Sequence, residues 1–164
     1  MENVLSKQFQ RQYEMMLGWV DGTINSLSDE DFKMELSPGK NTGVWILGHL
    51  VVSDDDLSTF LGKGKLLFPE YVKLFGQGTK VQPVENYPDV AALKKSWKQV
   101  SERNKIIYSE LTDKELNEPH AMIEDFEKDY FKTKERVIMA WQLHQVYHTG
   151  QLAIIKSRVG KSKF

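Results

Sequence analysis

The sequence has 164 residues, of which 40% are hydrophobic and 27% are charged, and this composition is typical of one folded domain with a substantial core. Its 22 basic and 23 acidic residues give a formal net charge of -1, so no basic face is indicated and we expect no nucleic-acid partner. It has no cysteine, no apolar run long enough to span a membrane and no recognisable secretory signal, so we expect a cytoplasmic protein whose metal sites would use nitrogen and oxygen ligands.

Four segments carry apolar residues at the spacing of three and four that is typical of amphipathic helices. We expect the second segment to begin at Asn41 or Thr42 and the fourth at Thr133, because these side chains can cap the first turn of a helix. The predicted helices span about residues 2–26, 42–61, 88–111 and 133–158. No convincing strand pattern is found, so the sequence predicts an all-α fold, a four-helix bundle formed by a single domain over residues 1–164.

The connections between these helices are long. Residues 28–32 and 69–75 are each predicted to form a short helical turn, the second of which ends at Gly76. The connection from residue 62 to residue 87 is long enough to cross the bundle, so helices that follow each other in sequence need not be antiparallel. In the loop 112–132 we expect the aromatic side chains to cover one end of the bundle; these are Phe126, Tyr130 and Phe131.

Three histidines lie in the apolar parts of the predicted helices. His144 and His148 are four residues apart, so they project from the same helical face, one turn apart, within an apolar stripe. His49 lies in the most apolar stretch of the chain, next to Gly48, which permits the close approach of another helix. Three neutral imidazoles suit zinc, nickel or a similar divalent ion, and they leave a coordination position for water or substrate, as in catalytic sites.

Other interpretations of the histidines stay open at this point. A pair four residues apart is also found at surfaces and among hydrogen-bonded core histidines. The zinc-protease pattern is excluded, because Gln145 stands where that pattern requires a glutamate. The fourth histidine, His120, follows Pro119 in a polar loop and is predicted to be exposed to solvent.

Several residues beside the histidines are candidates for supporting roles. Asp56 follows His49 by seven residues and returns to the same helical face two turns later. We expect the acidic run 54–56 to be a solvated turn; alternatively, Asp56 orients water, a substrate or a histidine. Tyr147 and Gln151 flank the histidine pair, where hydrogen bonding to a ligand and simple packing are both open. Elsewhere we expect three tryptophans in the core and two arginines at the surface, namely Trp45, Trp97, Trp141, Arg11 and Arg103.

The sequence resembles the DinB-like family of metalloenzymes in three stretches. These are residues 41–50, residues 69–78 and residues 144–152, the last containing the histidine pair followed by a Gly-Gln dipeptide. The resemblance implies an up-down-down-up bundle with a long crossover after its second helix. It also implies that His49, His144 and His148 are metal ligands, that the metal is zinc or nickel, and that the protein is a homodimer.

Characterised members of that family include thiol-dependent transferases. The leading hypothesis is therefore a divalent-metal-dependent enzyme that binds a small-molecule substrate and transfers a low-molecular-weight thiol to an electrophile, the metal favouring the reactive thiolate. The alternative is a non-catalytic, metal-binding stress-response or scaffold bundle whose ion is structural. A third hypothesis has no metal at all, only hydrogen-bonded core histidines.

Overall fold

A computed structural model of the chain describes residues 3–123 and 129–161. Within these ranges the regular structure is helical, with isolated β-bridges in place of any strand. The four long helices are α1 (Val4–Ser26), α3 (Gly43–Phe60), α5 (Val90–Glu110) and α7 (Lys134–Arg158). The predicted all-α class is confirmed, and the predicted helix boundaries agree with the observed ones to within about two residues.

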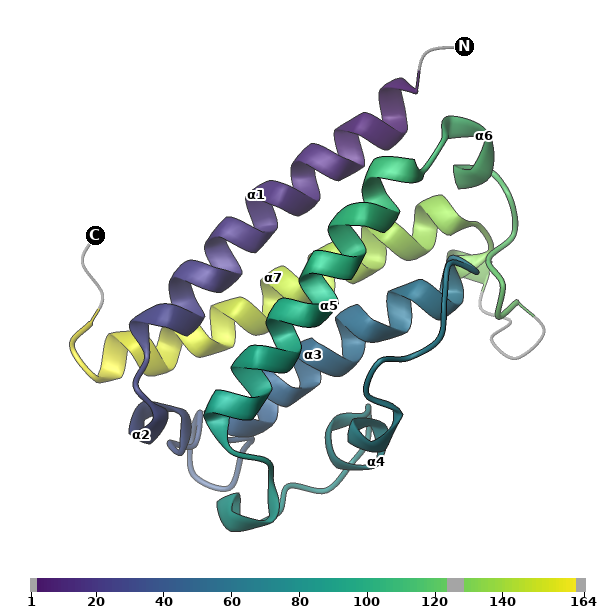
Figure 1. Ribbon diagram of the computed structural model, residues 1–164. Coiled ribbons are helices and arrows are strands. Elements are labelled where there is room, and N and C mark those ends of the chain that lie inside the picture. The colour runs from purple at the N-terminus through teal and green to yellow at the C-terminus, as the bar shows by residue number, and fades with distance from the viewer. Residues whose placement is uncertain (1–2, 124–128, 162–164) are drawn as a thin grey trace.

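The long helices form a bundle in which each packs against two others. Helix α1 lies against α5 and α7, and α3 lies against the same two helices, so α1 and α3 are diagonal to each other. Figure 1 shows that α1 and α7 run in one direction while α3 and α5 run in the other. This is the up-down-down-up order that the family resemblance implies, and the long connection between α3 and α5 is its crossover. None of the described helices combines the length and apolarity needed to span a membrane.

Short helical elements occupy the connections. The predicted turn at 28–32 is α2 (Asp29–Phe32), and the one at 69–75 is η1 (Pro69–Tyr71) followed by α4 (Val72–Phe75). The remaining elements are η2 (Val84–Asn86), α6 (Asp113–Leu116) and η3 (Asp129–Phe131). The loop prediction missed α6, although Thr112 and Glu115 carry its signal, a capping box in which each side chain accepts a hydrogen bond from the other's backbone N–H.

Threonine caps set the start of both helices that carry the histidines. The side chain of Thr42 accepts a hydrogen bond from the backbone N–H of Trp45 at 3.2 Å. Thr133 accepts one from the N–H of Arg136 at 3.4 Å. Each cap satisfies a backbone donor that the helix itself leaves free and so helps to set where α3 and α7 begin.

The prediction of a solvated acidic turn after His49 is wrong for Asp55. This side chain is buried and forms an ion pair with Arg103 at 2.7 Å, and it accepts hydrogen bonds from the backbone N–H groups of Leu67 and Phe68. Arg103 is accordingly not a surface residue as predicted, because its guanidinium lies along α3 and also donates to the backbone oxygen of Asp55 at 3.0 Å. The pair attaches the start of the crossover to the bundle.

Asp54 is also buried, at 1% exposure, in a polar network between the helices. Its carboxylate accepts a hydrogen bond from the hydroxyl of Tyr13 at 2.7 Å, and its backbone oxygen accepts one from the side-chain amide of Asn104 at 2.7 Å. The Tyr13 ring stacks on Tyr108, with ring centroids 4.3 Å apart. Burial, the largest influence, raises the pKa of Asp54 to about 6. The acid therefore belongs to the core and not to the solvated surface.

The predicted exposure of His120 is also wrong, since the side chain is only 1% exposed. The segment that carries it folds back onto the end of α3, where the N–H of Ala121 donates to the backbone oxygen of Phe60 at 2.8 Å. The His120 ring then packs beside the ring of Phe60 at 5.3 Å, and its Nδ1 accepts a hydrogen bond from the N–H of Met122.

The aromatic cover predicted for loop 112–132 is present only in part. Phe131 packs partly buried against the core and meets Trp141 edge-on, with ring centroids 6.0 Å apart. Tyr130 is 55% exposed and therefore covers little of the bundle. Phe126 lies outside the described residues.

Candidate metal site

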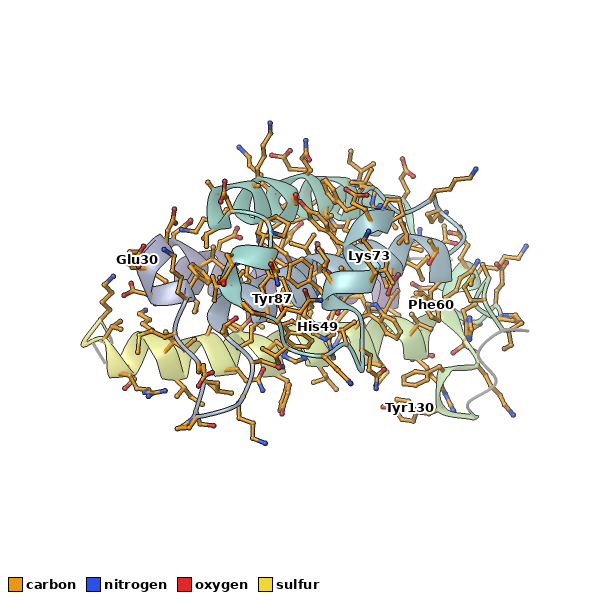
Figure 2. All side chains as sticks on the ribbon, turned by 90° about the horizontal axis from the view of Figure 1, so that it is seen from below. Glu30, His49, Phe60, Lys73, Tyr87 and Tyr130 are labelled. Carbon is orange, nitrogen blue, oxygen red and sulfur yellow. The ribbon has the colours of Figure 1, made fainter. Side chains whose placement is uncertain are left out.

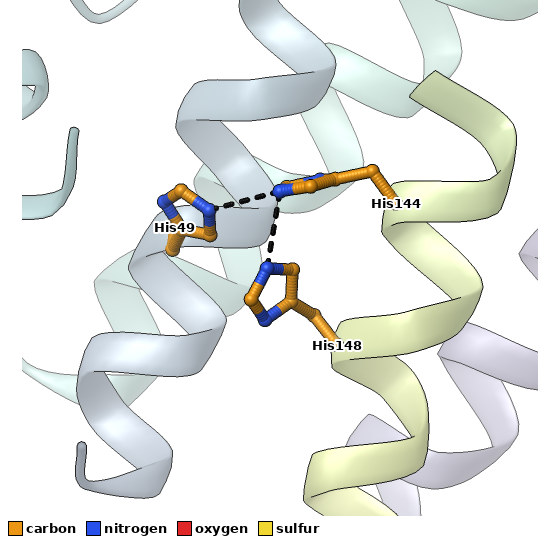
Figure 3. Close-up of side chains that lie close together, drawn as sticks. All are labelled: His49, His144 and His148. Atoms are coloured by element: carbon orange, nitrogen blue, oxygen red, sulfur yellow. Dashed lines mark hydrogen bonds between the residues drawn. The ribbon is translucent and has the colours of Figure 1, made fainter. Parts of the chain in front are cut away.

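The bundle brings the three predicted histidines to one point. His49 reaches inward from α3, and His144 and His148 reach it from successive turns of α7 (Figure 3). The Nε2 atom of His144 lies 3.1 Å from Nε2 of His49 and 3.0 Å from Nε2 of His148. One potential ligand atom from each ring therefore lies within 4.8 Å of the other two, a spacing at which all three could contact the same ion.

The orientation of His49 is set by the crossover. Its Nδ1–H donates to the backbone oxygen of Phe75 in α4 at 2.6 Å, and the Trp45 ring stacks on it at 4.7 Å. Figure 2 shows the crossover segment around Lys73 and Tyr87 on the side of the bundle where His49 lies. Because a carbonyl only accepts, the proton of neutral His49 is on Nδ1, and Nε2 presents a lone pair to the other histidines.

Gly48 makes this contact possible. A Cβ at this position would lie 2.4 Å from carbons of the Phe75 ring, closer than any two non-bonded carbons pack. The absence of a side chain therefore lets α4 dock directly on α3, as the sequence predicts for Gly48. The docking places the Phe75 carbonyl next to His49.

His148 has an equivalent partner on its own helix. Its Nδ1 lies 2.7 Å from the side-chain oxygen of Gln151, which accepts the hydrogen bond and leaves Nε2 of His148 without a proton. Nε2 of His144 can carry at most one hydrogen, yet it faces the lone pairs of both His49 and His148. Three nitrogen atoms converge with at most one proton among them, and a cation is the group that satisfies such an arrangement.

The electrostatic environment keeps the three rings neutral. Burial lowers the pKa of His49, and it lowers the pKa of His144 to about 3, with a further contribution from the two neighbouring imidazoles. Burial likewise lowers the pKa of His148 to about 4, although the hydrogen bond to Gln151 opposes this change. At neutral pH all three rings are therefore uncharged, each with a single ring proton, as metal binding requires.

A cavity of about 560 Å³ opens beside the histidines. Its wall includes the side chains of Trp45, Val52, Phe131 and Trp141, with Asp56 as its acidic member. The volume is sufficient for a small organic molecule. A ligand in this cavity could therefore reach an ion held by the three histidines.

The remaining candidates have different positions. Asp56 is half-buried in the cavity wall, where burial and the neighbouring charge of Asp55 raise its pKa to about 6. Gln151 contacts His148, as described above. Tyr147 packs edge-on against the His148 ring at 5.0 Å but is 65% exposed. Trp45 and Trp97 are buried as predicted, whereas Trp141 is only partly buried and lines the cavity.

Comparison with known proteins identifies a family. No match was found among curated proteins. The DinB superfamily matches residues 8–152, a range that contains all three clustered histidines and most of the bundle. The chain therefore belongs to the DinB superfamily.

Proposed function

We propose that His49, His144 and His148 bind one divalent metal ion, zinc or nickel. The observation that carries this proposal is the convergence of one ring nitrogen from each histidine within 4.8 Å of the other two, while the Nδ1 protons of His49 and His148 are held by Phe75 and Gln151. Partners of this kind orient histidine ligands and raise their basicity in metal sites. Imidazole nitrogen is a favoured ligand of both metals.

Metal analysis of the purified protein tests this proposal. The wild-type protein is expected to retain about one ion per chain after dialysis, and His148→Ala at least about tenfold less. Ser157→Ala is the matched control, because Ser157 lies on the same helix, is exposed and does not line the cavity. Equal metal content in wild type and His148→Ala would overturn the assignment.

We further propose that the protein is an enzyme that transfers a low-molecular-weight thiol to an electrophilic small molecule. The chain has no cysteine, so a thiol nucleophile must come from a cosubstrate. A divalent ion at this site would supply positive charge that favours the thiolate form of that cosubstrate. The three histidines line the cavity, and the apolar side chains of Trp45 and Val52 lie in the wall beside them.

A thiol-consumption assay with the metal-loaded protein tests the enzymatic proposal. Small thiols and electrophiles such as aryl halides and epoxides are combined, and thiol loss is followed with wild type, with His148→Ala and without protein. The expected result is faster consumption with wild type alone. Metal binding without turnover in any combination would favour the alternative, a scaffold bundle with a structural ion.

We propose that two copies of the chain associate and that the reaction takes place in the cytoplasm, where cells keep small thiols reduced. Helix α7 supports the first point, since it exposes a row of apolar side chains that includes Met139, Leu143 and Tyr147. Light scattering is expected to give twice the chain mass for wild type and the chain mass for Leu143→Glu. A monomeric wild-type protein at micromolar concentration would refute the homodimer.

A further inference from the structure

The three consecutive aspartates of α3 have unequal surroundings. Asp54 receives a hydrogen bond from Tyr13, and Asp55 is paired with Arg103 and two backbone N–H groups. The carboxylate of Asp56 has neither a hydrogen-bond donor nor a cation beside it among the residues that the structure describes. Only this third carboxylate lies in the wall of the histidine cavity. The first two acids are thus engaged in the fold, and Asp56 is available to a ligand.

The position of Asp56 is unfavourable for an unpaired charge. The side chain is partly withdrawn from water, and the carboxylate of Asp55, which is paired with Arg103, is adjacent to it in sequence. A carboxylate in such a place gains most from a partner that brings a positive charge. The cavity's described wall contains no lysine or arginine that could pair directly with Asp56, and an ion on the histidines would lie about two helical turns away, so a directly paired cation would come from the ligand.

The rest of the wall also suits a cationic group. Trp141 and Phe131 present aromatic rings in the same cavity, and aromatic faces attract ammonium groups. The described wall is poorly matched to a ligand with several carboxylates. Asp56 would repel these groups, and the described wall has no lysine or arginine to pair with them. The charge of the described wall therefore favours a thiol or electrophile that carries a positive charge over one that carries several negative charges.

We propose that the substrate of this site carries a positively charged nitrogen, such as a primary ammonium group, and that Asp56 pairs with it while another atom of the same molecule reaches the three histidines. This inference rests on the proposed metal-dependent function and adds to it the chemical class of the substrate. Asp56 is then a specificity-determining residue. It follows His49 by two helical turns, about 10 Å along α3, which sets the scale of the molecule that can reach both.

Cobalt-loaded protein allows the inference to be tested with two series of probes. Aminoalkanethiols and hydroxyalkanethiols, each with chains of two to six carbons, are titrated, and binding is read from the thiolate-to-cobalt absorption band. Matched members differ only in the charge of the end group. At the best-fitting length the amine is expected to bind about five- to tenfold more tightly than the alcohol.

Variants assign this preference to one carboxylate. Asp56→Asn is expected to bind the aminoalkanethiols as weakly as wild type binds the hydroxyalkanethiols. The control Asp89→Asn is expected to keep the preference for the amine, because Asp89 is exposed and outside the cavity. Equal affinity of wild type for amine and alcohol at every length would overturn the inference, as would a preference that survives in Asp56→Asn. In both cases the metal site itself would stand. If wild type bound no cobalt, or His148→Ala bound as much, the proposed function would fail and the inference with it.

Discussion

Replacing Gly48 with alanine perturbs the contact that orients His49 without altering any of the three histidines. The new Cβ would lie 2.4 Å from the Phe75 ring, whereas carbon atoms in contact need about 3.5 Å, so Phe75 must retreat by about 1 Å. We expect this overpacking to reduce the free energy of unfolding by about 1–3 kcal/mol. The Phe75 carbonyl would move with its ring and weaken the 2.6 Å hydrogen bond to His49, which we expect to reduce zinc affinity about 10- to 100-fold.

Two measurements check this prediction. Competition with a chromophoric chelator gives the zinc affinity, and urea unfolding of the metal-free protein gives the stability. The control is Gly18→Ala in the middle of α1, where a Cβ would meet nothing within 4 Å. We expect the control to keep its zinc affinity and to gain up to about 1 kcal/mol of stability. Wild-type stability and zinc affinity in Gly48→Ala would show that the α4 contact does not hold His49.

Three further predictions follow from the buried charges and the histidine cluster. Burial raises the pKa of Asp54 to about 6, so the folded state holds this proton more tightly than the unfolded state, and the contribution of Asp54 to the stability of the metal-free protein should fall by about 3 kcal/mol as the pH rises from about 4 to about 6. The histidines, with lowered pKa values, act in the opposite direction, and Asp56, with a raised pKa, acts in the same direction. Urea unfolding therefore compares wild type with Asp54→Asn across this pH range, and the difference between their free energies of unfolding isolates the contribution of Asp54. Parallel pH profiles would contradict the prediction. Arg103→Met leaves Asp55 buried without its partner, so the free energy of unfolding measured in urea should fall by about 3–5 kcal/mol. A decrease below about 1 kcal/mol would show that the ion pair contributes little. Zinc at about 100 times its Kd should raise the free energy of unfolding by about 2.7 kcal/mol and Tm by about 5–10 °C. EDTA should reverse this rise, and His148→Ala should not show it. An equal rise in His148→Ala would show that the ion binds elsewhere.

Local sequence patterns account for the parts of the fold that were predicted. The long helices follow from apolar spacing, and the starts of α3 and α7 follow from Thr42 and Thr133, because both signals act within a few residues. The same periodicity placed His144 and His148 on one inward face. His49 could be assigned to the same centre only because the surrounding stretch is apolar enough to be central in a bundle.

The incorrect predictions concern residues whose partners are distant in sequence. Asp55 and Arg103 are 48 residues apart, and neither has a local feature that indicates an ion pair. His120 is buried because its loop returns to the end of α3, and polarity along the loop does not reveal that path. The partner of His49 is the backbone oxygen of Phe75 in α4. Every residue has such an oxygen, so the sequence does not indicate which one His49 contacts.

The crossover has a consequence for the dynamics of the molecule. Phe75 belongs to a short helix that packs into the space left by Gly48, and its carbonyl is the partner of His49. Local opening of α4 would remove that partner, so by reciprocal linkage an ion on the histidines must oppose the opening of α4. Amide hydrogens in α4 should therefore exchange more slowly with solvent deuterium once zinc is bound, although no residue of this segment is a proposed ligand.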